Sequence, residues 1–191
     1  MRLFARTALL GFAAVLCTSA YANDYAAAIE NHAKSKVSQW LQDPVIINAI
    51  KAQNQANAGM GQGQIDALDK QWRAEVSAPK HPLIDGVLNN ALSAFLKAKE
   101  KASNGLYSEI FVMDNHGLNV GQSEITSDYW QGDEAKWQKT YSVGPGSMHI
   151  SEVEQDESTQ TYQSQLSLPI TDPANGAVIG AITIGINVEA L

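Results

Sequence analysis

The segment from Thr126 to Tyr141 is the most unusual part of the chain, because it mixes aromatic side chains with carboxylates. Four aromatic residues fall within 13 positions and two aspartates accompany them, giving the set Asp128, Tyr129, Trp130, Asp133, Trp137 and Tyr141. Aromatic faces attract cations, and sites with apolar walls and a few polar groups bind small organic molecules. We therefore predict that these residues contact a small organic ligand, particularly an amine-bearing or cationic one.

The same segment has a structural interpretation. It could form a short connecting helix that plugs the edge of a sheet with Trp130, Trp137 and Tyr141. Such a plug could also form one wall of a pocket, so the two interpretations remain open.

A second acidic group follows at Glu152, Glu154, Asp156 and Glu157. It could place a carboxylate opposite the aromatic segment or bind calcium. A solvated turn is the favoured interpretation, because the spacing does not match a calcium-binding EF-hand loop.

Signals for an enzyme are poor. The four histidines, at positions 32, 81, 116 and 149, are scattered without the close pairing that a metal site uses. Ser147 follows Gly-Pro-Gly and does not lie in a nucleophile elbow. We predict no enzymatic activity, no cofactor and no metal. An exported hydrolase is the weaker alternative, and it would need converging carboxylates or a Ser-His pair.

The first 22 residues are predicted to be a signal peptide. Arg2 and Arg6 precede a short apolar stretch, and Ala20-Tyr21-Ala22 supplies a cleavage site after Ala22. The whole chain has 191 residues, one cysteine and a net charge of -7. Removing the segment takes away that cysteine and leaves 11 basic and 20 acidic residues, a net charge of -9.

This composition excludes several classes of function. A cysteine-free exported chain suits an oxidising compartment and has no thiol for catalysis. An acid excess argues against nucleic acid and anionic membranes as partners. No segment after the signal is apolar enough to span a membrane, so the mature product is expected to be soluble and periplasmic.

The elements that position the aromatic segment are helices followed by strands. Apolar residues recur at helical spacing over 24–58, with a break at Asp43-Pro44 where a second helix is expected to begin, and again over 65–78 and 82–104. From 106 the pattern changes to strands at 108–113, 118–122, 148–154, 161–170 and 178–188. Along 161–170 apolar residues point to one side and Gln163 and Gln165 to the other, and along 178–188 bulky residues, expected to pack on a helix, alternate with small or polar ones. This order predicts an α+β fold, with a helical region over 23–105 packed on an antiparallel sheet of about five strands over 106–191. The two regions are expected to form one domain.

Several short stretches, in their order and spacing, resemble the Cache (PDC-type) family of extracytoplasmic sensor domains. After a long N-terminal helix, these stretches are 112–117 (VMDNHG), 127–129 (SDY), 168–172 (LPITD) and 178–184 (VIGAITI). The resemblance covers about residues 26–191. It implies a PAS-like sheet with a small-molecule pocket under its covering loops, and ligand sensing outside the inner membrane as the input of a chemoreceptor or histidine kinase.

The resemblance also bears on individual residues. In this family the segment after the second strand supplies pocket residues, which corresponds here to Asp128 to Trp137, and a later turn often adds an acidic residue, here Asp156. Members that bind amino acids commonly carry an aspartate late in the last strand, where this chain has Gly185. That difference argues against an α-amino acid ligand. Receptors continue into a transmembrane helix, whereas this sequence stops at Leu191.

The main hypothesis is therefore a free-standing periplasmic Cache-like domain that binds a small organic ligand and acts through a membrane-bound receptor or kinase. The alternative is a ligandless interaction module of the same fold, whose aromatic residues fill the pocket. In that alternative the N-terminal helices form a homodimer or dock on a receptor.

Overall fold

The structure is a computed structural model that describes residues 23–155 and 161–191. The predicted signal peptide, residues 1–22, and Asp156 lie outside the described residues. The helices are α1 Ala26–Ser35, α2 Pro44–Ala56, α3 Gln62–Glu75, α4 Pro82–Leu88, α5 Ala91–Ala102 and the short α6 Ala135–Gln138, with 3-10 turns η1 Val37–Gln39 and η2 Val188–Ala190. The strands are β1 Tyr107–Met113, β2 Asn119–Gln122, β3 His149–Ile150, β4 Glu154–Gln155, β5 Tyr162–Thr171 and β6 Val178–Asn187.

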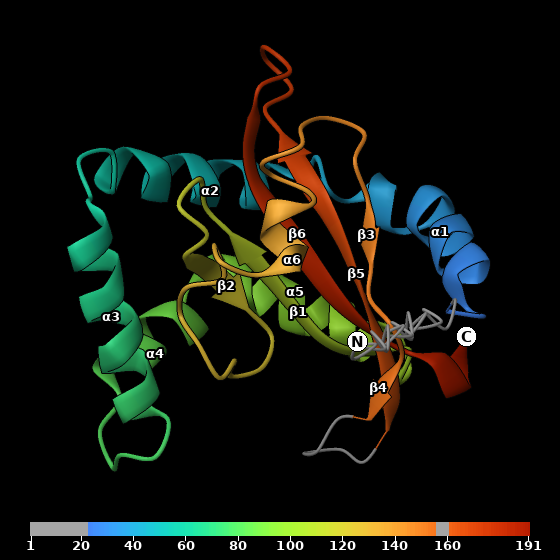
Figure 1. The fold of residues 1–191 in the computed structure, drawn as a ribbon, viewed down its shortest axis with the longest axis horizontal. Coiled ribbons are helices and arrows are strands. Elements are labelled where there is room, and N and C mark those ends of the chain that lie inside the picture. The colour runs from blue at the N-terminus through green and yellow to red at the C-terminus, as the bar shows by residue number, and fades with distance from the viewer. Residues whose placement is uncertain (1–22, 156–160) are drawn as a thin grey trace, which may run out of the picture.

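The strands form one antiparallel sheet in the order β2-β1-β6-β5-β3, and β4 also pairs with β5 (Figure 1). The predicted α+β fold, with helices first and an antiparallel sheet after them, is confirmed. The sheet has six strands among the described residues, because the predicted strand at 148–154 is divided into β3 and β4.

Two polar residues set the starts of the central helices. The Asp43 side chain accepts a hydrogen bond from the backbone N–H of Val45, and Pro44 occupies the first helical position, as the sequence predicts. The predicted helix over 82–104 is wrong in one respect, because it is divided into α4 and α5. Asn90 divides it by accepting a hydrogen bond from the backbone N–H of Ser93 and so capping a new helix.

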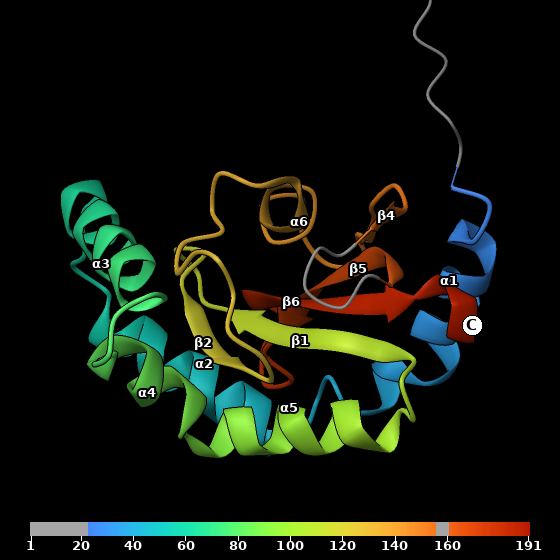
Figure 2. The same ribbon diagram turned by 90° about the horizontal axis from the view of Figure 1, so that it is seen from below.

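The main core lies between the sheet and the helices α1, α2 and α5. Alternation along β6 directs Ile182, Ile184 and Ile186 to this side, where all three are fully buried with residues of α2 and α5. Figure 2 shows α2 and α5 under one face of the sheet and α6 with its flanking loops over the other. We call this second side the outer face. The sheet is therefore covered on both sides, and a site can form on either.

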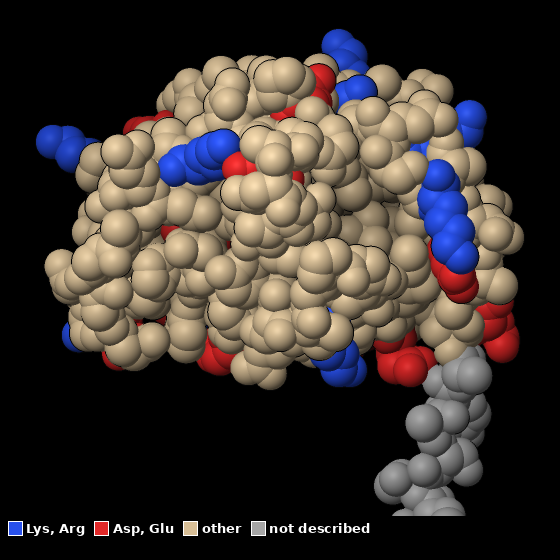
Figure 3. Space-filling model, turned by 90° about the horizontal axis from the view of Figure 1, so that it is seen from above, with Lys and Arg blue, Asp and Glu red and all other residues tan. Residues whose placement is uncertain are grey.

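Positive and negative side chains are interspersed over the face drawn in Figure 3. One close pair on the surface is Lys34 with Glu30, in α1. Among the described residues, none of the helices is both long enough and apolar enough to cross a membrane.

Candidate functional site

The aromatic segment 126–141 leaves β2 at one edge of the sheet and then crosses onto the outer face. Its first half joins a small apolar cluster between the sheet edge and the helices α3 and α4, where Trp72 and Leu118 are fully buried. Its second half packs on β1 and β6. The segment is therefore divided between two environments.

Tyr129 belongs to the first environment. Its ring is 6% exposed and stacks on Trp72, with 5.2 Å between ring centroids and 16° between planes. Burial and then the nearby charge of Asp114 raise the pKa of Tyr129 to about 12. The phenol is therefore neutral at neutral pH and can donate a hydrogen bond.

The backbone at this position is held by α3. One carboxylate oxygen of Asp69 accepts the N–H groups of both Tyr129 and Trp130, at 3.0 Å each. The other oxygen accepts Arg73 Nε at 2.7 Å, and Arg73 also lies 3.1 Å from a carboxylate oxygen of Asp128. The hydrogen bond to Asp69, together with the charges of both aspartates, raises the pKa of Arg73. Asp128 is thus paired within the protein.

Trp137 and Tyr141 belong to the second environment. Their rings stack with 4.7 Å between centroids and pack on Phe111, Met113 and Ala181 of the outer face. Burial and the charge of Asp114 raise the pKa of Tyr141. These two aromatic residues cover one part of the outer face.

The remaining predicted residues are Trp130, which packs against the first cluster, and Asp133. Trp130 is half-buried and donates from Nε1 to the carbonyl of His116 at 2.8 Å, and Asp133 is exposed. The structure therefore brings Tyr129 and Trp130 together at the sheet edge and Trp137 and Tyr141 together on the outer face. It does not gather all four aromatic residues around one cavity.

A polar cavity opens on the outer face beside α6. It has a volume of about 290 Å³ and is bounded by α6, by β3 and β4, and by the outer side of β5. Its lining is Glu134, Ala135, Lys136, His149, Ser151, Glu154, Gln163 and Gln165. We call it the sheet-face pocket.

Lys136 is the cation of this pocket. Its side chain is only 14% exposed, and its ammonium lies 2.8 Å from Glu134 and 5.4 Å from the centre of the Phe111 ring. Burial, together with the charges of Lys139 and Lys136, lowers the pKa of His149, so this imidazole is neutral at pH 7. The lining therefore presents two carboxylates, from Glu134 and Glu154, against one ammonium.

The floor of the pocket is a polar network across three strands. Gln165 Nε2 donates to a carboxylate oxygen of Glu109 at 2.9 Å, and the hydroxyl of Ser108 donates to Gln163. Both bonds pass over Gly185, where a Cβ atom would contact the Ser108 hydroxyl, the Gln163 amide oxygen and the Glu109 side chain. Side chains from β1 and β5 therefore occupy the space that an aspartate at position 185 would need.

The sequence predicted ligand-contacting residues within the segment 126–141 or a plug at the sheet edge, and it did not identify the residues that line the sheet-face pocket. Glu134 and Lys136 lie inside the predicted segment, and Gln163 and Gln165 lie on the predicted non-core side of β5. Glu154 belongs to the second acidic group. The feature of the sequence that could have indicated this pocket is the pair of glutamines, Gln163 and Gln165, on a side of the sheet that other elements cover.

The described residues contain no group of three or more His, Cys, Asp or Glu side chains that could hold a metal ion. Three of the four histidines form hydrogen bonds within the protein: His32 with the Tyr107 hydroxyl, His81 with Asp85 and His116 with the carbonyl of Asn57.

The chain is similar to solved sensor and ligand-binding domains of histidine kinases and chemoreceptors, which is the class of domain that the sequence motifs resemble. No family model matches the sequence, and no curated protein does.

The similar solved structures include the sensor domain of the Vibrio cholerae histidine kinase DctB, with a TM-score of 0.49, 13% identity, and coverage of 86% of this chain and 50% of that one. They include the ligand-binding domain of the Campylobacter jejuni chemoreceptor Tlp3 in complex with L-valine, with a TM-score of 0.40, 14% identity, and coverage of 80% and 62%. The ligand-binding domain of the Pseudomonas aeruginosa chemoreceptor PctC, in complex with GABA, has a TM-score of 0.33, 11% identity, and coverage of 65% and 61%. The chain thus spans about half to three fifths of the length of these domains.

Proposed function

We propose that this protein is a periplasmic, non-enzymatic sensor-type domain that binds a small organic molecule in the sheet-face pocket. The observation that carries the proposal is a cavity of about 290 Å³ whose lining is polar and charged, on a covered face of the sheet. Lys136 and Glu134 pair in this lining and Glu154 adds a second carboxylate, and a pocket lined by charged and amide groups suits a polar ligand.

The charges indicate the class of ligand. With His149 neutral, the lining carries a net charge of about one negative unit, which favours a compound with an amine. Lys136 provides one position for a carboxylate or another hydrogen-bond acceptor on the same compound. A small amine that also bears an acceptor is the ligand we propose.

The signal would pass to a second protein. The proposal includes a membrane-bound receptor or kinase as the partner, since such sensor domains usually serve as inputs of these proteins. The N-terminal helices are the surface we propose for pairing of two copies or for docking on the receptor.

A ligandless interaction module remains the second candidate, and one observation favours it. The Trp137–Tyr141 stack covers Phe111, Met113 and Ala181, so the protein's own aromatic residues fill part of the outer face. In this candidate the remaining cavity beside Lys136 would hold only water.

A thermal-shift screen of small amines, with and without a carboxylate, distinguishes the two candidates. A ligand at 100 times its dissociation constant raises the free energy of unfolding by about 2.7 kcal/mol, which is readily detected. Glu134→Gln should weaken binding of an amine hit about tenfold, equivalent to about 1.4 kcal/mol, because it removes a carboxylate from the lining.

The matched control is Glu124→Gln, which makes the same change at an exposed glutamate outside the lining. It should bind the hit as the wild type does. The proposed site is wrong if both variants bind equally, and the ligandless module is favoured if no amine stabilises the wild type.

A further inference from the structure

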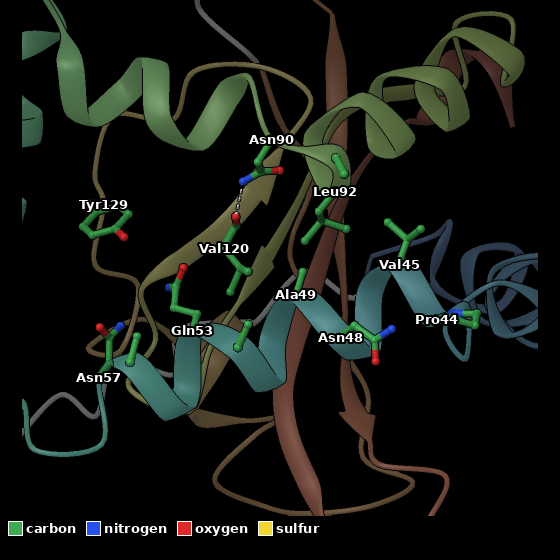
Figure 4. Close-up of a pocket in the computed structure, with 13 residues that line it drawn as sticks. Pro44, Val45, Asn48, Ala49, Gln53, Asn57, Asn90, Leu92, Val120 and Tyr129 are labelled. Carbon is green, nitrogen blue, oxygen red and sulfur yellow. Dashed lines mark hydrogen bonds between the residues drawn. The ribbon is translucent and has the colours of Figure 1, made fainter.

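A second and larger cavity lies on the opposite, helical side of the sheet. It is a groove of about 740 Å³ between α2 and the start of α5, with β2 at its base (Figure 4). We call it the α2–α5 groove. Its volume lies within the range of small-molecule sites.

The body of the groove is apolar. The small side chains of Ala49, Ala52 and Ala56 leave space along α2, and Leu92 and Val120 form the base of the groove. None of the 13 lining residues carries a charge. An apolar body of a ligand would therefore be buried there without displacing an ion pair.

One end of the groove carries hydrogen-bonding groups. Figure 4 shows the hydroxyl of Tyr129 directed into the groove. This side chain is 94% buried, since its exposure is 6%, and no hydrogen bond to its hydroxyl is found among residues 23–155 and 161–191. The hydroxyl oxygen itself is open to the groove, so water or the polar head of a ligand there can accept a hydrogen bond from it.

The amide of Gln53 complements this phenol. Its nitrogen donates to a carboxylate oxygen of Asp114 at 3.0 Å and to the carbonyl of Asn119 at 3.3 Å. Both N–H groups are thus used, and the amide oxygen is left as an acceptor. Tyr129 as donor and Gln53 as acceptor line the same groove.

We propose that the α2–α5 groove is a second binding site, distinct from the sheet-face pocket, for a neutral molecule with an aliphatic body and a hydroxyl or carboxamide head. The head accepts a hydrogen bond from the Tyr129 hydroxyl and donates one to the Gln53 oxygen. An anionic head is disfavoured by the Asp114 carboxylate behind Gln53, and a cationic head finds no charged partner in the lining.

The test is a titration of the isotope-labelled protein, followed by the shifts of its backbone amide signals. The probes are 1-hexanol and hexanamide, with hexanoate and hexylammonium as charged compounds of equal chain length. The neutral pair should saturate, with shifts centred on residues 44–57 and 90–92, and should bind at least fivefold more tightly than the charged pair.

Two variants test the assignment. Tyr129→Phe keeps the stack on Trp72 and removes only the hydroxyl, so it should bind hexanamide about fivefold to tenfold more weakly while its melting temperature is unchanged. Ala52→Leu fills the groove and should abolish binding, whereas Gln55→Leu, at an exposed α2 position outside the lining, should not.

Several results would overturn the proposal. They are equal binding by Tyr129→Phe and the wild type, equal binding by Ala52→Leu and Gln55→Leu, tighter binding of a charged probe, or no saturable binding of either neutral probe. Sedimentation that shows a dimer dissociated by Ala52→Leu would assign the groove to a second copy of the chain instead. Glu134→Gln should leave hexanamide binding unchanged, so the outcome does not depend on the sheet-face pocket.

Discussion

Asp114 connects the turn between β1 and β2 to α2, and its removal should destabilise the whole domain. One carboxylate oxygen accepts the backbone N–H groups of His116 and Leu118 at 2.8 and 2.9 Å. The other accepts the side-chain amides of Gln53 and Asn57 at 3.0 and 3.1 Å. Asp114 itself is fully buried.

The expected cost of Asp114→Ala follows from these bonds. The two amides lie beside the α2–α5 groove, where water can reach them, but the two backbone N–H groups lose their acceptor in the turn. Each unsatisfied buried donor costs about 1–3 kcal/mol, which gives a loss of about 4 kcal/mol in the free energy of unfolding. For a domain of this size, that loss lowers the melting temperature by roughly 8–16 °C.

Urea unfolding followed by circular dichroism measures this loss, with the slope against urea checked for constancy. The control is Asp43→Ala, which removes a half-buried aspartate that accepts only one backbone N–H, from Val45, and should cost about 1 kcal/mol. If Asp114→Ala costs no more than Asp43→Ala, Asp114 does not have the structural role assigned to it.

Two further predictions concern stability. Gly117→Ala should lower the free energy of unfolding by about 3 kcal/mol, because Gly117 has a φ of +83° and a Cβ atom would lie 2.6 Å from the Gly132 backbone. Gly63→Ala, with open space inside α3, should instead raise the free energy of unfolding by about 0.5–1 kcal/mol. An equal change in the melting temperatures of both variants would refute this prediction. Burial raises the pKa of Glu75, but hydrogen bonds from Gln71 and from the backbone of Ile84 and Leu83 outweigh it and lower that pKa below 4.5. A carboxyl whose pKa is lower in the folded than in the unfolded protein stabilises the fold at pH values above its unfolded pKa, and this stabilisation is lost as the pH falls through its folded pKa. The difference in the free energy of unfolding between wild type and Glu75→Gln should therefore be full at pH 6–7 and shrink below pH 4.5. A difference that stays constant from pH 7 to pH 3 in urea unfolding would contradict it.

The local part of the fold could be predicted from the sequence. Alternation of bulky and small residues along β6 specified its core side, and the Asp43-Pro44 pair specified where α2 begins. These features depend on neighbouring residues, so they are readable in one stretch of chain. The break at Asn90 was not predicted, because apolar residues continue at helical spacing on both sides of it.

The site could be predicted only in part, because it is assembled from distant segments. Lys136 and Gln165 line the same pocket although 29 positions separate them. The path of the aromatic segment is set by Asp69, which binds the backbone of Tyr129 and Trp130 from α3, and nothing in the spacing of these residues indicates that contact. The aromatic residues therefore cluster in sequence but separate in space.

A crystal structure of the protein with its best amine hit tests the central proposal most directly. We expect ligand density in the sheet-face pocket, with the amine beside Glu134 or Glu154 and an acceptor group beside Lys136. An empty sheet-face pocket in crystals saturated with that hit, or density for the amine at another place on the molecule, would contradict the proposal.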